Sequence, residues 1–163
     1  GVGMTLSPPR IPWSAPGLSH SELMGMSIQF PSLKMVKSHK LSHGNAGIIT
    51  VCMLGVKSHS DRTTVRYDLV IDFREFPSSV PTAYVRNPAD ADIKHVNIAE
   101  GQRYSFAPGA DICWICVGGG RYDAQFQNYP KDRRFRLEAF FTQLHQTLRN
   151  PNVHDIACHG RLN

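Results

Sequence analysis

The segment 65–73 reads Val-Arg-Tyr-Asp-Leu-Val-Ile-Asp-Phe, and it decides the fold. Apolar side chains recur at every second position from Val65 to Phe73, with charged residues at three of the four positions between them. Successive side chains of a β-strand point to opposite faces of a sheet, so this alternation predicts a strand with one apolar face. That face needs a covering layer from elsewhere in the chain.

Three neighbouring segments complete a predicted sheet. The run 48–56 is largely apolar, and Gly44-Asn45 before it suits a turn. Segments 33–36 and 82–85 are shorter strand patterns, one before and one after this pair. Because short connections join all four segments, the sequence predicts a four-stranded antiparallel meander.

A helix near the C-terminus has the pattern needed to cover the sheet. Asp132 is a suitable N-cap, and Asn150-Pro151 ends the helix. Its apolar residues recur at helical spacing on one face: Leu137, Phe140, Phe141, Leu144 and Leu148. A shorter helix, from the capping box Ser19-His20-Ser21-Glu22 to about Ile28, precedes the sheet. The predicted fold class is therefore α+β, with the meander packed on the C-terminal helix.

Length and composition fit one domain. The chain has 163 residues, of which 41% are hydrophobic, enough for a single core. Residues 1–17 are rich in proline and predict a flexible arm, and residues 18–163 form the predicted domain. The stretch 86–131 shows little regular pattern, which in a compact domain indicates a functional segment.

The charge pattern argues against two classes of partner. The net charge is +5, but only 131–136 forms a basic cluster. A nucleic-acid groove usually has a denser basic stripe with stacking aromatics, so we interpret this cluster as a solvated surface. No apolar run approaches the roughly 20 residues that cross a bilayer, and no leader opens the chain. We therefore expect no nucleic-acid or membrane partner, and a cytoplasmic protein with reduced cysteines.

Four short motifs occur in order along the chain. They are Phe76-Pro77-Ser78-Ser79-Val80-Pro81, His95-Val96-Asn97-Ile98, Ile112-Cys113-Trp114 and Leu148-Arg149-Asn150-Pro151-Asn152. They resemble the Phe-Pro-x-x-Tyr-Pro, His-Pro-Asn-Ile, Ile-Cys-Leu and Leu-x-x-Pro-Asn segments of the ubiquitin-conjugating enzyme family. The resemblance covers about residues 33–155 and includes the predicted order of strands and helices.

The resemblance is to a divergent member, similar to the conjugating enzymes of bacterial ubiquitination-like operons. Val80 and Val96 stand where the family motifs have tyrosine and proline. His95 and Cys113 lie 18 positions apart, a longer interval than the family shows, and the extra residues fall in 99–111.

The resemblance implies a role for each motif residue. Cys113 would accept a ubiquitin-like modifier from an activating enzyme as a thioester and pass it to a lysine amine of a target protein. Asn97 would stabilise the tetrahedral oxygen or brace the active-site loop, and His95 would pack and hydrogen-bond that loop. No cofactor or metal is implied at this step. The operon similarity implies a function in bacterial antiviral defence.

Three alternatives stay open. Cys116, three positions after Cys113, is a rival nucleophile. The two thiols, with His154, Cys158 and His159, offer soft ligands for zinc. The third alternative is a catalytically inactive variant of the fold that binds ubiquitin-like proteins or scaffolds other enzymes, and the long interval between the motifs favours it.

Overall fold

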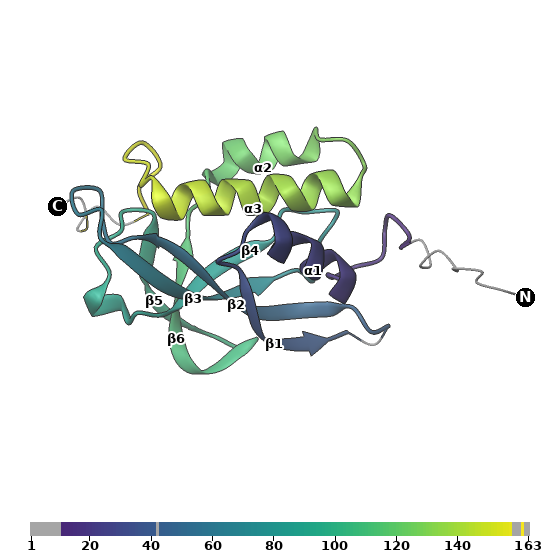
Figure 1. Cartoon of the computed structure of the whole chain (residues 1–163), viewed down its shortest axis with the longest axis horizontal. Helices are drawn as coiled ribbons and strands as arrows, with labels where there is room; N and C mark the ends of the chain where they lie inside the picture. Colours follow the sequence, from purple (N-terminus) through teal and green to yellow (C-terminus); the bar gives the residue numbers. More distant parts are fainter. Residues whose placement is uncertain (1–10, 42, 158–160, 162–163) are drawn as a thin grey trace, which may run out of the picture.

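The structure of the chain, a computed structural model, describes residues 11–41, 43–157 and 161. In chain order the elements are α1 (His20–Gln29), β1 (Lys34–Lys40), β2 (Ala46–Val56), β3 (Thr64–Asp72), β4 (Thr82–Asn87), the short 3-10 helix η1 (Asp90–Asp92), β5 (Ile98–Tyr104), β6 (Ala107–Ile115), α2 (Gly119–Gln127) and α3 (Arg133–Arg149). The six strands form one antiparallel sheet in the order β1-β2-β3-β4-β6-β5. Figure 1 shows the helices on one face of this sheet, and residues of all three share its core. Among the described residues, no helix combines the length and apolar character needed to cross a membrane.

The predicted meander is confirmed as β1 to β4, which pair in succession. The prediction that the sheet has four strands is wrong, because the stretch 86–131 also holds β5, β6 and α2. β5 and β6 form a hairpin that joins the sheet where β6 pairs with β4. β5 is an edge strand, and its exposed positions include Glu100, Gln102 and Arg103. Its sequence therefore lacks the apolar alternation from which a strand could have been predicted.

The alternation in β3 serves two apolar clusters, one on each face of the sheet. Tyr67 and Leu69 are buried in the main core with the helices. Val70 belongs to a smaller cluster that also contains Ile48, Tyr84, Ala107 and Ile112. The β5–β6 hairpin adds Tyr104 to this second cluster, with its ring 4.9 Å from that of Tyr84. The predicted apolar face is thus confirmed, and the opposite face is partly covered as well.

The predicted C-terminal helix is confirmed as α3, with a close approach to the sheet at its end. The side chain of Asp132 caps the helix by accepting from the backbone N–H of Phe135 at 2.9 Å. Near the other end, a Cβ atom on Gly55 of β2 would lie 2.7 Å from the carbonyl oxygen of Leu148 and 2.9 Å from its Cβ. Glycine at position 55 therefore sets how closely α3 approaches β2.

We predict opposite effects for two glycine-to-alanine substitutions. Gly55→Ala should destabilise the fold by about 2–3 kcal/mol, since its methyl group meets the backbone of α3. Gly25→Ala is the matched control, because Gly25 lies inside α1 with open space around it. This control should stabilise the fold by about 0.5–1 kcal/mol through helix propensity. Urea unfolding measures both, and equal effects would contradict the close approach of α3 to β2.

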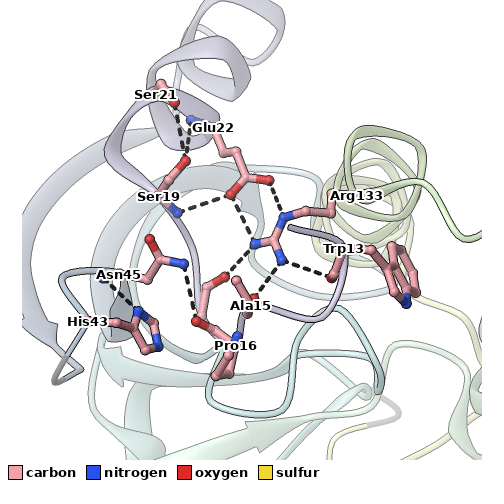
Figure 2. Close-up of polar contacts among 10 residues, drawn as sticks. Trp13, Ala15, Pro16, Ser19, Ser21, Glu22, His43, Asn45 and Arg133 are labelled. Atoms are coloured by element: carbon pink, nitrogen blue, oxygen red, sulfur yellow. Dashed lines mark hydrogen bonds and ion pairs between the residues drawn. The ribbon is translucent and has the colours of Figure 1, made fainter. Parts of the chain in front are cut away.

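The capping box at α1 is confirmed and extended into a buried ion pair. Ser19 Oγ accepts from the N–H of Glu22 at 3.2 Å, and Glu22 Oε1 accepts from the N–H of Ser19 at 3.1 Å. Arg133 of α3 donates to both carboxylate oxygens of Glu22, each at 3.1 Å. Figure 2 shows the Glu22 carboxylate between the start of α1 and the Arg133 guanidinium. One side chain therefore caps α1 and links it to α3.

The same guanidinium fastens the segment before α1. Arg133 also donates to the carbonyl oxygens of Trp13, Ala15 and Gly17, at 3.2, 2.5 and 2.8 Å (Figure 2). Only 8% of Arg133 is exposed, so its charge is balanced by the Glu22 carboxylate and its other N–H groups donate to these carbonyls. The end of the predicted proline-rich arm thus contacts α3, whereas residues 1–10 lie outside the described residues.

The interpretation of 131–136 as a solvated basic surface is wrong for two of its arginines. Arg136, like Arg133, is buried, and its guanidinium donates to the carbonyls of Pro77 and Tyr129. It also lies over the ring of Trp13, 4.9 Å from the centroid. Pro77 and Trp13 lie far from the cluster in sequence, so local charge density gave no sign of these contacts.

We predict that Arg133→Met costs about 3 kcal/mol of stability, because Glu22 and three carbonyls lose a buried donor. Arg134→Met is the matched control. Its side chain is 85% exposed and pairs with Glu138 four residues along the helix, so the change should have little effect. Thermal and urea unfolding compare the two variants. A similar cost for both would contradict the anchoring role of Arg133.

Candidate functional site

Asn97 braces the connection into β5 against the segment after α3. Its side chain is fully buried, and its Oδ1 accepts from the N–H of Asn152 at 2.8 Å. Its Nδ2 donates to the carbonyls of Asn152 and Asp155, at 2.9 and 2.8 Å. The amide is therefore used in holding 152–155 in place. Such contacts fit the bracing role that the family resemblance implies for this residue.

His95 is held on both ring nitrogens. Its Nδ1 accepts from the N–H of Asn97 at 3.2 Å, and its Nε2 lies 3.2 Å from the carbonyl oxygen of Leu148. Because the carbonyl of Leu148 can only accept, Nε2 carries the ring hydrogen. Because Nδ1 accepts from an N–H, it carries no hydrogen, and the ring is therefore neutral. Burial lowers the pKa of His95 to about 4. At neutral pH this histidine has no free nitrogen and no charge, which suits a structural role rather than proton transfer.

Cys113 lies near the end of β6. It pairs with Val85 of β4 on one side and with Gly101 of β5 on the other. Only 3% of the residue is exposed, and it belongs to the main core. Burial, and to a smaller extent the charge of Asp111, raises the pKa of its thiol. This environment favours the neutral thiol over the nucleophilic thiolate.

Cys116 is the thiol that the fold places beside Asn97. Its N–H donates to the carbonyl of Asn97 at 2.8 Å, just beyond the end of β6. It lines an open cavity of about 350 Å³ that also includes Thr147, Asn152 and Asp155. Cys113 is three residues back along the chain, about 10 Å at ~3.3 Å per strand residue. The structure therefore brings Asn97 and Cys116 together, whereas Cys113 lies inside β6, further from Asn97.

Cys52 has a polar environment that the sequence did not indicate. Its Sγ donates to Asp68 Oδ1 at 3.0 Å, and Arg66 Nη2 donates to the same sulfur at 3.0 Å. Burial is the main cause that raises the pKa of this thiol. The register opposes Cys52 to Asp68 and Leu54 to Arg66, so only the pairing of β2 with β3 brings these groups together.

The zinc alternative depends on residues outside the described part of the chain. Within residues 11–41, 43–157 and 161, no group of three or more His, Cys, Asp or Glu side chains is placed to hold a metal ion. Cys158 and His159, two of the five residues that suggested zinc, are not described.

Comparison with protein-family models, with characterised proteins and with solved structures finds no match to this chain.

We predict that His95 makes the fold sensitive to acid. The folded state keeps His95 neutral down to about pH 4, whereas the unfolded chain binds its proton near pH 6.5. The stability that neutral His95 contributes is thus complete above pH 6.5 and is lost as pH falls towards 4, by about 3 kcal/mol in total. Urea unfolding at a series of pH values measures this loss.

The comparison that isolates His95 is between wild type and His95→Gln. The variant should lose less stability between pH 7 and pH 4.5 than wild type, because it lacks the group that takes up a proton on unfolding. Burial also lowers the pKa of His145, but that contribution is common to both proteins. Exposed His59→Gln should keep the wild-type slope. Identical slopes for wild type and His95→Gln would contradict the assignment.

Proposed function

We propose that this chain is a divergent domain of the ubiquitin-conjugating fold that acts in a ubiquitin-like conjugation pathway as a binding module. The element order supports the fold: an N-terminal helix, a four-stranded meander, a crossover that contains the buried His95 and Asn97, and a helix ended by Asn150-Pro151. Its ligand would be a ubiquitin-like modifier or an enzyme that carries one, within a pathway such as bacterial antiviral defence.

The burial of Cys113 is the observation that carries this proposal. A transthiolation nucleophile must reach the thioester carbon on a second protein, so its sulfur needs an open approach. Cys113 is enclosed between two paired strands, with helices over the core that it faces. Exposing it requires the sheet to open at β6, which breaks backbone hydrogen bonds and uncovers core residues.

A second candidate function is thioester transfer through Cys116, favoured by its position beside Asn97 in an open cavity. The Cys116 thiolate would attack the thioester carbon of a loaded activating enzyme, whose own cysteine leaves as a thiolate. A lysine amine of the target would then attack the new thioester, forming an amide and releasing Cys116 as a thiol. Transfer through Cys113 requires the same steps after an opening of the β5–β6 hairpin.

The test combines thiol labelling with loading. In native protein, iodoacetamide should label Cys116 before Cys113, with sites read by mass spectrometry, because Cys116 lines an open cavity whereas Cys113 is enclosed in the main core. Ubiquitin, an activating enzyme and ATP serve as the loading probe, followed by a non-reducing gel. A binding module forms no thiol-sensitive adduct, and Cys113→Ser keeps its affinity for ubiquitin in an NMR titration.

Each other outcome selects a different function. An adduct that Cys116→Ala abolishes and Cys113→Ala retains establishes the second candidate. An adduct lost only in Cys113→Ala overturns the binding-module proposal and establishes Cys113 as the nucleophile. Cys52→Ala serves as the control thiol in both assays, because it lies away from Asn97 on β2.

A further inference from the structure

A second open cavity, of about 410 Å³, lies where the sheet ends beneath α2. It is bounded by the segment that leads into β4, by the end of β6 and by one side of α2. Its apolar walls include Val80, Pro81, Trp114 and Ala124. It shares only Val117 with the lining of the Cys116 cavity, so it is a separate feature of the surface.

Trp114 is more exposed than the residues on either side of it in β6. Its neighbours Cys113 and Ile115 are 3% and 1% exposed, whereas Trp114 is 37% exposed. A tryptophan that is left open to solvent in a groove is a common anchor of binding surfaces, because its large rigid ring binds at little entropic cost. The ring also carries a negative π face that attracts cations.

The charge in this groove has the opposite sign to that of the chain. The net charge is +5, yet Asp123 is the one ionisable side chain among the described residues that line the groove. Asp123 is exposed on α2, and within the described part of the chain its carboxylate makes no ion pair. Gln127, one turn further along α2, adds an amide to the same wall.

We propose that this groove binds a lysine or arginine side chain of an extended peptide segment in a partner protein. The aliphatic part of that side chain would pack on Trp114 and Pro81, and its cationic end would reach the Asp123 carboxylate. The proposal goes beyond the function proposed above, since it involves neither a thiol nor a ubiquitin-like modifier. Charge complementarity selects the cation, because Asp123 would repel an acidic side chain and would give a neutral one no ionic attraction.

The test is a ¹⁵N NMR titration of the whole chain with two capped tripeptides, acetyl-Gly-Lys-Gly-amide and acetyl-Gly-Arg-Gly-amide. The indole signal of Trp114 is distinguished from that of Trp13 with Trp114→Phe. We expect saturable shifts of the Trp114 indole and of the Gly119 and Ala124 amides. Asp123→Asn should weaken binding by about threefold to tenfold, the loss of one partly exposed charge contact.

Matched controls decide the outcome. Asp92→Asn removes an exposed carboxylate from η1 and should leave the affinity unchanged. The acetyl-lysine and glutamate versions of the peptide should not bind. Equal shifts with acetyl-lysine, an unchanged affinity in Asp123→Asn, or no saturable shift with either cationic peptide would overturn the proposal. None of these results bears on the loading assay, so the two proposals fail separately.

Discussion

The position of α3 on the sheet is the constraint on which the rest of the structure depends. At its start, Arg133 joins α3 to α1 through Glu22. At its end, Gly55 leaves room for Leu148, whose carbonyl oxygen lies 3.2 Å from His95 Nε2. A helix fixed at both ends also fixes the segment that follows it. Asn97 can therefore brace 152–155, and Cys116 is held beside that brace.

Local sequence patterns identified the elements whose signals are local. The period of two in β3 and the apolar positions of α3 follow directly from burial on one face. The Ser19 capping box likewise needs only four residues. β5 is polar because it lies at an edge, and α2 begins after Gly118, whose φ of 132° resembles a turn rather than a helix start. β5 thus lacks the apolar period by which strands are recognised, and α2 is a short helix with only Tyr122 and Phe126 buried at helical spacing.

The candidate site was predictable in composition but not in geometry. The motif around His95 and Asn97 indicated a hydrogen-bonded loop, and both side chains are buried in such contacts. Which of two cysteines accompanies them depends on the register of β6. Cys113 pairs with Val85 of β4 and Gly101 of β5. These partners depend on how β6 is aligned with its two neighbouring strands, and the residues beside the thiol do not determine that alignment. Register is a long-range property, and a one-residue slip would exchange the faces of the strand.

Three residues near the end of β6 lie in different chemical environments. Cys113 enters the core, Trp114 lines the groove beneath α2, and Cys116 meets Asn97 as the strand ends. The difference in burial between Cys113 and Trp114 follows from the period of two in a strand, which sends adjacent side chains to opposite faces. The groove lies at the end of the sheet, where both Trp114 and Ile115 line it. The placement of Cys116 continues the antiparallel register of Ile98 opposite Ile115 by one position, so that Cys116 meets Asn97 where the pairing of β5 with β6 ends. Cys116 lines an open cavity there, although only 8% of the residue is exposed, and the two glycines Gly118 and Gly119, both at positive φ, allow the chain to turn between β6 and α2.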